Sequence, residues 1–420
     1  MPRYQSKTGT ILSQFWHSSD RISSIHTAFF PHNFPKIYGY YVDSFEEFRN
    51  GVQPYCQRPD GTLLLPRRST GGWRGDPVSS PPFTSTEKFW NAFNSGFRPL
   101  LDTEQLGTFI LVLANASFDT SLQAELNEII KQRYHALYQR FEQQLLSGEI
   151  PPESDEDLLV FFKIATVGLE RIASSKTRTL SNWEIQFNPL RAFRPRRISS
   201  AISDAISLPF CNESFHFNKP FMDKEIFWSG ELEGRSVDLY YNKYPFTQGH
   251  GLLVPERGLE NPQLLTESYH HYLCKVATTL DASLPGSGFG YNSYGAYASV
   301  NHLHFQMFLR ETPFPIEQSQ WRHHGGEQPY PATCFCTNRA AEAWQWIEQC
   351  HQNGTPYNVL YIGERCYLLP RLRQGSDHPP QWSSGFSWHE MAGGILTSSR
   401  AGFEEMTAAA IETLLGEASG

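Results

Sequence analysis

Two histidines and a glutamine stand at alternate positions in the segment GYNSYGAYASVNHLHFQ, residues 290–306. The polar residues are His302, His304 and Gln306, and the apolar residues that alternate with them are Leu303, Phe305 and Met307. If residues 300–309 form a strand, successive side chains point to opposite faces. The sequence therefore predicts one apolar face against the core and one face that presents two imidazoles and an amide.

Three roles are open for such a polar face. Two histidines two positions apart can bind a metal, with Cys334, Cys336 and the pair His323–His324 as further ligands, although this spacing fits no common zinc pattern. A purely structural strand is the second role. The third is nucleophilic catalysis, because a neutral imidazole can attack a phosphorus centre and form a covalent adduct. That nucleophile needs an acceptor for its other ring nitrogen and donors for the phosphoryl oxygens.

The loop before the histidines suits the need for phosphate donors, because its glycines allow a close backbone approach and its polar residues can donate. The glycines are Gly286, Gly288, Gly290 and Gly295, and the polar residues are Asn292, Ser293 and Ser299. A glycine-rich loop alone is more often only a turn. Its position directly before the alternating histidines favours the phosphate-binding interpretation.

The elements that must position these residues show mixed periodicity in the second half of the chain. The sequence predicts strands over 236–245 and 249–255, a helix over 265–280, a hairpin over 357–371, a last strand over 386–398 and a closing helix over 403–414. Hairpins and helices that do not alternate strictly are typical of an α+β fold with an antiparallel sheet.

The first half of the sequence contains no motif to which we assign a catalytic or binding role. Residues 1–118 are predicted to be rich in loops, and a helix is expected from Thr120, where Gln123 has capping-box spacing. Its apolar stripe is Leu126, Ile130, Tyr134, Leu137, Phe141 and Leu145. A second apolar helix is expected near 158–169, after a break rich in glycine and proline.

Composition sets the broad class. The chain has 420 residues, of which 40% are hydrophobic and 19% charged, as expected for a globular protein. A net charge of -8 argues against general nucleic-acid binding. The apolar runs are shorter than the ~20 residues that cross a bilayer, and no apolar signal core begins the chain. Seven scattered cysteines are expected to be mostly reduced thiols, so a cytoplasmic protein without a membrane partner is predicted.

The motif HLHFQ resembles the active-site signature of the histidine triad superfamily, in the transferase branch where glutamine replaces the third histidine. The whole segment 290–306 is similar to the GDP-hexose phosphorylases. Further similar segments are FNPLRAFRPRR (187–197), LPFCNESFHFNK (208–219), YNKYPFTQGHGLLVP (241–255), YNVLYIGERCYLLPR (357–371) and FSWHEMAGGIL (386–396). The resemblance implies an antiparallel sheet like that of galactose-1-phosphate uridylyltransferase, flanked by helices. It places a catalytic nucleotidyltransferase domain at 181–420, behind a helical and loop-rich accessory region of unclear role at 1–180.

The resemblance also implies roles for single residues. His304 would be the nucleophile, the backbone carbonyl of His302 would hold its other nitrogen, and Gln306 would donate to phosphoryl oxygens. Phosphate would be cradled by Asn292, Ser293, Gly295 and Ser299. Asn242 would line the nucleotide pocket. Arg191 and Lys219 are candidate phosphate contacts, the first as part of a basic cluster with Arg194, Arg196 and Arg197. His250 is expected to be a core-edge histidine that bonds backbone.

The implied reaction cleaves a GDP-hexose with inorganic phosphate into GDP and hexose 1-phosphate, through a nucleotidyl-histidine intermediate. It requires no metal or other cofactor, and inorganic phosphate is the co-substrate. Lys243, Tyr244 and Gln248 depart from the GDP-hexose pattern, and the motif NKYP is similar to dinucleoside tetraphosphate phosphorylases. The alternatives are therefore a dinucleoside polyphosphate phosphorylase and a non-catalytic nucleotide-binding protein.

Overall fold

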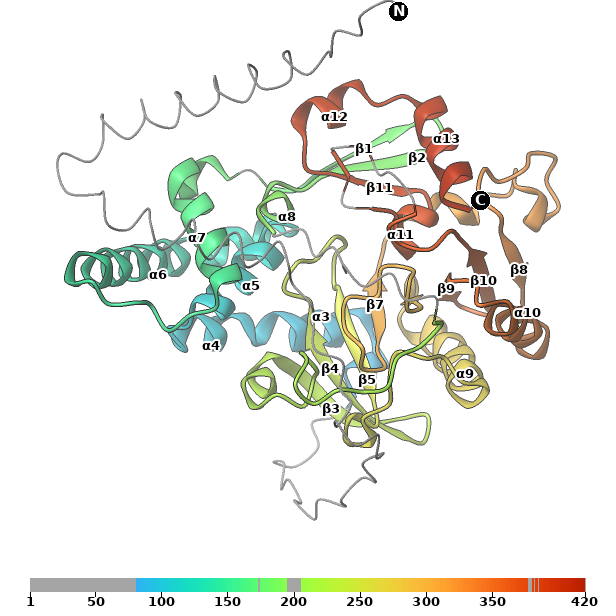
Figure 1. Ribbon diagram of the computed structural model, residues 1–420, viewed down its shortest axis with the longest axis horizontal. Coiled ribbons are helices and arrows are strands. Elements are labelled where there is room, and N and C mark those ends of the chain that lie inside the picture. Colours follow the sequence, from blue (N-terminus) through green and yellow to red (C-terminus); the bar gives the residue numbers. More distant parts are fainter. Residues whose placement is uncertain are drawn as a thin grey trace, which may run out of the picture. The chain divides into compact units, whose positions relative to one another are not determined.

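The computed structural model describes residues 81–172, 174–194, 205–376, 380, 382–383 and 385–419 (Figure 1). The predictions for residues 1–80, and those for Arg196 and Arg197, lie outside the described residues.

An eight-stranded sheet is the centre of the described fold. In spatial order its strands are β3 (Ile226–Leu232), β4 (Arg235–Tyr241), β5 (Gly251–Pro255), β7 (Phe305–Leu309), β6 (Ser287–Asn292), β9 (Tyr357–Ile362), β10 (Arg365–Pro370) and β8 (Phe335–Thr337). Every neighbouring pair is antiparallel. The predicted α+β class with an antiparallel sheet is confirmed, and so is the hairpin of β9 and β10.

The two faces of this sheet carry different partners. On one face α9 (Glu267–Ser283) packs on β6 and β9, and α10 (Ala340–Asn353) packs on β10. Leu303, Phe305 and Met307 are buried in the cluster on this side, as their alternation predicts. The other face meets α11 (Trp388–Met391), and Phe308 and Trp388 share a second cluster there.

The polar motif itself is not a strand throughout, contrary to the expectation for residues 300–309. β7 begins only at Phe305. Pairing with β7 stops at Leu253 of β5, opposite Phe305, and at Gly290 of β6, opposite Gln306, although β5 and β6 themselves continue to Pro255 and Asn292. His302 and His304 therefore lie in the irregular segment that enters the sheet.

A three-stranded sheet lies beside the second cluster. Its strands are β1 (Lys176–Leu180), β2 (Trp183–Phe187) and β11 (Gly394–Thr397), with β11 parallel to β2. The single strand expected over 386–398 is wrong, because Ser387 and Glu390 form a capping box that starts α11, and Gly393 turns the chain with φ 93°. The closing helix is split into α12 (Arg400–Glu405) and α13 (Ala408–Ser419).

The N-terminal described helices share one hydrophobic cluster with the large sheet. They are α3 (Thr86–Ser95), α4 (Phe97–Asp102), α5 (Leu106–Ala116), α6 (Thr120–Ser147) and α7 (Asp155–Val167). Asp119, not Thr120, caps α6, because its carboxylate accepts the N–H groups of Ser121 and Leu122. The domain division at 180/181 stays a prediction.

Short helical turns connect the larger elements. They are α8 (Pro189–Phe193), η2 (Pro82–Thr84), η3 (Leu169–Arg171), η4 (Pro220–Glu225), η5 (Arg257–Leu259), η6 (Pro315–Glu317) and η7 (Arg322–His324). Two of them bear on the site: α8 carries Arg191, and η5 presents a backbone carbonyl to His302.

Candidate active site

His304 is a buried, neutral imidazole with one ring nitrogen engaged. Its Nδ1 lies 2.8 Å from the backbone carbonyl oxygen of His302, so Nδ1 carries the proton and donates. Burial lowers the pKa of His304 to about 4. Within the described chain no hydrogen bond engages Nε2 of this ring. At neutral pH the lone pair of Nε2 is therefore available for nucleophilic attack.

His302 is also neutral, and its ring is locked in one orientation. The N–H of Phe217 donates to Nδ1 at 3.2 Å, which leaves the proton on Nε2, 3.2 Å from the carbonyl oxygen of Arg257. Burial, and secondarily the repulsion that a protonated His304 would exert, lower the pKa of His302 to about 4. Both ring nitrogens of His302 are thus used in hydrogen bonds to the backbone. What His302 contributes to the site is its backbone carbonyl, which accepts from His304.

Gln306 presents its amide with a defined orientation. Trp388 Nε1–H donates to Gln306 Oε1 at 3.0 Å. The N–H of Phe246 donates to Nδ1 of His250, so the proton of His250 sits on Nε2, 3.2 Å from the same Oε1. With two donors on the oxygen, the NH₂ group of Gln306 points away from both. No hydrogen bond in the described part of the molecule engages that NH₂ group.

His250 combines the expected role with a second one. It accepts a backbone N–H, as a core-edge histidine should, and it also orients Gln306. Burial, followed by the charge of Arg191, lowers its pKa to about 3, so the ring stays neutral. Trp388 approaches closely because residue 290 is glycine: a Cβ there would lie 2.3 Å from the indole.

The residues expected to cradle phosphate are built into the fold at the end of β6. Asn292 Oδ1 accepts from Asn358 Nδ2 at 2.7 Å and from the N–H of Trp388 at 3.1 Å. The hydroxyl oxygen of Ser293 accepts the N–H of Tyr357 at 2.9 Å. These contacts hold the loop in place, and the backbone N–H of Ser293 is used in the same way, because it donates to the carbonyl oxygen of Tyr357 at 3.1 Å.

Other predicted contacts spread around this centre. Gly295 has φ 81° and lies under the guanidinium of Arg373, which a Cβ would meet at 2.7 Å. Ser299 is exposed. Lys219 donates to the carbonyl oxygen of Asn212 at 2.6 Å on the surface. Asn242 lies beside His250, with its Nδ2 3.1 Å from Nε2 of that ring; both nitrogens carry hydrogens, so neither accepts from the other.

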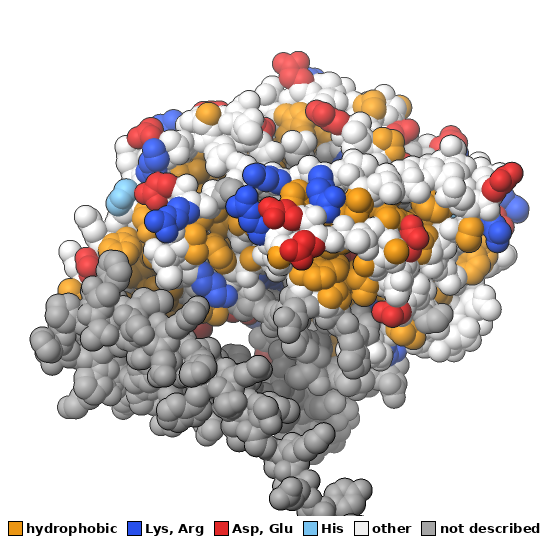
Figure 2. Space-filling view, turned by 90° about the horizontal axis from the view of Figure 1, so that it is seen from above, with side chains coloured by type: hydrophobic (Ala, Val, Ile, Leu, Met, Phe, Trp, Pro, Cys, Tyr) orange, Lys and Arg blue, Asp and Glu red, His pale blue; other side chains and the backbone are white. Residues whose placement is uncertain are grey.

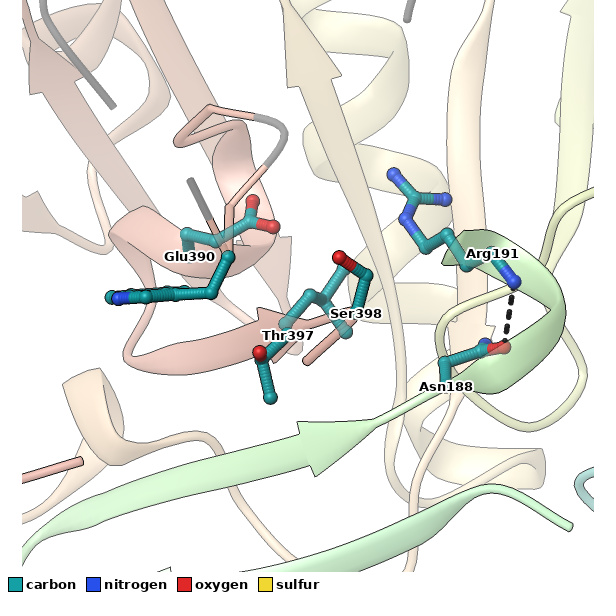
Figure 3. A pocket seen from close by; sticks show the side chains of 7 residues that line it. Asn188, Arg191, Glu390, Thr397 and Ser398 are labelled. Atoms are coloured by element: carbon teal, nitrogen blue, oxygen red, sulfur yellow. Dashed lines mark hydrogen bonds between the residues drawn. The ribbon is translucent and has the colours of Figure 1, made fainter. Parts of the chain in front are cut away.

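Arg191 lines a small polar pocket next to Phe246. Its guanidinium stacks 4.9 Å from the Phe246 ring, which in turn lies 4.2 Å from the ring of His250. Figure 3 shows Arg191 and Glu390 on opposite sides of the pocket, with Thr397 and Ser398 between them and Asn188 bonded to the backbone of Arg191. The remaining lining residues are Trp382 and Leu396.

The charges in this pocket are adjusted by burial. Burial lowers the pKa of Arg191, and the charge of Glu390 partly offsets that. The carboxyl of Glu390 has a pKa raised by burial and lowered by Arg191. Arg191 also donates to the carbonyl oxygen of Tyr244 at 2.9 Å. A guanidinium that faces a cavity with only part of its donors used can take an anionic oxygen.

Three residues that sequence reasoning missed complete the site. Trp388 orients Gln306, Gln263 binds the backbone of His304, and Phe217 contacts both histidine rings. None of them has a spacing signal that links it to the motif. Trp388 falls in a segment that was expected to be a strand, and Gln263 and Phe217 fall in loops.

The described residues offer no set of ligands for the metal-binding alternative. Over residues 81–172, 174–194, 205–376, 380, 382–383 and 385–419, no group of three His, Cys, Asp or Glu side chains is close enough to hold a metal ion. His324 instead contacts Tyr367 and Arg365. The cysteines Cys274, Cys334, Cys336, Cys350 and Cys366 are free thiols.

The surface and the helices add two observations. On the face in Figure 2, basic and acidic side chains are intermingled over the described residues. None of the helices in the described ranges has both the length and the apolar character that crossing a membrane requires.

Comparison with known proteins agrees with the resemblance. Residues 172–308 match the family model described as GDPGP1-like, N-terminal domain. Over 137 residues the chain is 34% identical to GDP-D-glucose phosphorylase 1 of Danio rerio. This alignment covers 32% of this chain and 38% of that protein. Over 148 residues it is 38% identical to GDP-L-galactose phosphorylase 1 of Arabidopsis thaliana, covering 31% and 33%. The matched part thus spans between 33% and 38% of the length of these relatives.

A solved structure also shows similarity. The crystal structure of yeast Ap4A phosphorylase Apa2 has a TM-score of 0.41 and 17% sequence identity, covering 64% of this chain and 95% of that one. A similarity of this degree does not indicate a substrate. The resemblance to GDP-hexose phosphorylases is confirmed for the matched segment, which includes His302, His304 and Gln306.

Proposed function

We propose that this chain is a nucleotidyltransferase that cleaves a GDP-hexose with inorganic phosphate, giving GDP and hexose 1-phosphate. One observation carries the proposal: Nδ1 of His304 donates to the carbonyl of His302 at 2.8 Å, while the ring is neutral and no hydrogen bond from the described residues engages its Nε2. The GDP-hexose substrate is supported by the names of the relatives that match residues 172–308.

In the first step the lone pair of His304 Nε2 forms a bond to the α-phosphorus. The bond from that phosphorus to the bridging oxygen breaks, and hexose 1-phosphate leaves with the electron pair. The ring then carries a positive charge, which the carbonyl of His302 stabilises through Nδ1–H. In the second step an oxygen of inorganic phosphate attacks the same phosphorus, the P–N bond breaks, and its electron pair returns to Nε2.

Gln306 contributes a donor without acid–base chemistry. Its NH₂ group, turned outward by the two donors on Oε1, stabilises the phosphoryl oxygens as charge builds in each step. An amide cannot deliver a proton to a leaving group, and hexose 1-phosphate leaves as an anion that needs none. This combination favours transfer to phosphate over hydrolysis.

The remaining residues are assigned to binding. Asn242 and the loop around Asn292, Ser293, Gly295 and Ser299 contact the nucleotide and its phosphates. Arg191 takes a phosphate oxygen in its pocket, and Lys219 acts at the rim. Residues 181–420 form the catalytic domain, 1–180 are accessory, and the enzyme works in the cytoplasm without a metal, membrane or nucleic-acid partner.

The test is an assay with the full chain, inorganic phosphate, and a panel of GDP-hexoses and dinucleoside polyphosphates. GDP and hexose 1-phosphate should appear only when phosphate is present. Release of a nucleoside diphosphate from a dinucleoside polyphosphate, with none from any GDP-hexose, would overturn the substrate. Nucleoside monophosphate without added phosphate would overturn phosphorolysis.

A further inference from the structure

The backbone of His304 lies just before β7 begins and takes no part in strand pairing, yet both of its polar groups are satisfied. The partners come from one side chain. Gln263 Oε1 accepts the N–H of His304 at 2.9 Å, and Gln263 Nε2 donates to the carbonyl oxygen of His304 at 3.2 Å. Nε2 also donates to the carbonyl oxygen of Asn292 at 3.0 Å. The glutamine amide thus bonds the backbone as a neighbouring strand would.

We infer that Gln263 is a positioning residue for His304: its buried amide takes the place of strand pairing at His304 and fixes the backbone from which the imidazole projects. The functional readout of this inference rests on the function proposed above. The inference itself stands on the three hydrogen bonds and on the absence of strand pairing for His304 in the described sheet.

Only one orientation of this amide satisfies all its neighbours. A backbone N–H can only donate, so it must face Oε1, and two carbonyl oxygens can only accept, so they must face Nε2. A glutamine therefore fits, while a carboxylate or an apolar side chain does not. Gln263 is 1% exposed, so water cannot replace the lost bonds cheaply.

Gln263 is itself held on both sides of its peptide unit. Its N–H donates to Asn301 Oδ1 at 3.0 Å, and its carbonyl oxygen accepts from Tyr291 Oη at 3.2 Å. One residue earlier in the motif, the N–H of Leu303 donates to the carbonyl oxygen of Asn261 at 2.9 Å. Segment 261–263 therefore runs along 301–304 and holds it.

The consequence concerns the contact between His304 Nδ1 and the carbonyl of His302. Both groups belong to one short backbone stretch, so their 2.8 Å separation depends on the backbone angles between them. Gln263 fixes the peptide units on both sides of the His304 Cα. Without it the imidazole loses its defined direction, and a displacement of about 1 Å in a reacting group costs on the order of 100-fold in rate.

The test uses two variants in the full chain. Gln263→Met keeps the size and removes all three hydrogen bonds, so kcat should fall about 100-fold while KM for the GDP-hexose changes little. Gln263→Glu keeps the acceptor for the His304 N–H but faces two carbonyls with a carboxylate. Burial raises the pKa of that carboxyl, and only its protonated form can donate. Its kcat should therefore rise as pH falls from 8 to 6, where the wild-type kcat is flat.

Tyr272→Phe is the matched control. Tyr272 is buried, and its hydroxyl donates to the carbonyl oxygen of Leu232 at 3.1 Å, away from the site. It should lose thermal stability with kcat and its pH profile unchanged. A merely structural role for Gln263 predicts the same behaviour, with kcat per folded molecule unaltered in all three variants, and that result would overturn the inference.

A second readout does not depend on the substrate. Nitrogen chemical shifts of the histidine rings report which nitrogen carries the proton. In the wild type His304 should be protonated at Nδ1 only, and in Gln263→Met both tautomers should be populated. Unchanged shifts in Gln263→Met would overturn the positioning role even if GDP-hexose is not the substrate. Changed shifts would uphold it in that case, while the proposed function would fail separately in the wild-type assay.

Discussion

The indole Nε1–H of Trp388 donates to Gln306 Oε1 at 3.0 Å, and this contact decides which way the glutamine amide faces. His250 Nε2–H adds a second donor to the same oxygen at 3.2 Å. Because both partners are donors, the NH₂ group of Gln306 is turned toward the side where the phosphoryl oxygens would lie. The orientation of the proposed phosphate donor thus depends on a residue 82 positions away in the chain.

Trp388→Phe should lower kcat about 5–10-fold, because one hydrogen bond of about 1 kcal/mol no longer opposes rotation of the Gln306 amide. The effect on KM should be smaller. Trp321→Phe is the matched control, since the Trp321 indole is also buried and donates to the carbonyl oxygen of Pro315 at 2.7 Å. Steady-state kinetics on both variants decide the matter: an equal loss of kcat in both would show that Trp388 acts through stability alone.

The sequence was informative where chemistry and periodicity coincide. Alternation placed Leu303, Phe305 and Met307 in the core, and the structure confirms that. It also put two imidazoles and an amide next to a glycine-rich loop. Spacing along one segment carries this information because a single stretch of backbone positions all of these residues.

Contacts between distant segments could not be predicted from the sequence. Gln263 bonds the backbone of His304, 41 positions away in the chain. A single side-chain hydrogen bond of this kind produces no periodic pattern in the sequence from which it could be predicted. The strand was expected to begin at residue 300, but β7 begins at Phe305, and the backbone of His304 bonds the Gln263 side chain in place of a neighbouring strand. The bond from the N–H of Tyr357 to the hydroxyl oxygen of Ser293 is another contact between distant segments, and the expected role of Ser293 in phosphate binding stays a prediction.

The pH dependence of kcat follows from the neutral state of His304. Burial lowers its pKa to about 4, so the nucleophile stays unprotonated through pH 6.5, the ordinary pKa of histidine. The rate of nucleotidyl transfer should be flat from pH 8 to about 5.5 and should fall only as the pH approaches the lowered pKa. Single-turnover rates measured across this range test it. An acid limb centred near pH 6.5 would contradict the buried, neutral imidazole.

Stability should follow pH in a related way. His250, with a pKa of about 3, and His270, with a pKa of about 4, are neutral in the folded protein, while the unfolded chain binds protons below about pH 6.5. The unfolded state thus takes up more protons as pH falls from 6.5 toward 4, and the free energy of unfolding decreases over that window by up to about 1.4 kcal/mol per pH unit for each such group.

His270→Gln isolates one of these groups away from the site. His270 lies between Tyr361 Oη and the carbonyl oxygen of Ala340, each at 2.9 Å. Urea denaturation at a series of pH values should show a shallower loss of stability in acid for this variant than for the wild type, with kcat unchanged at pH 8. A slope identical to that of the wild type would mean that His270 is not neutral in the folded state.

Lys243→Ala addresses the choice between substrates. In NKYP the lysine resembles that of dinucleoside tetraphosphate phosphorylases, but here Lys243 Nζ lies 2.6 Å from Asp157 Oδ1 on α7. The variant should lose about 1 kcal/mol of stability or less, and keep its ratio of kcat/KM for GDP-hexose over dinucleoside polyphosphate. Asp157→Asn is the control that breaks the same pair from the other side. A changed ratio in Lys243→Ala alone would show that the lysine reaches the substrate.

The central claim is that His304 becomes covalently nucleotidylated. The measurement is to incubate the full chain with GDP-hexose labelled at the α-phosphorus in the absence of phosphate, isolate the protein, and then add inorganic phosphate. Label should stay on the protein through base and be lost in acid, as expected for a phosphorus–nitrogen bond, and phosphate should release it as labelled GDP. His304→Ala should take up no label. Full turnover by His304→Ala, or label that inorganic phosphate cannot release, would contradict the account.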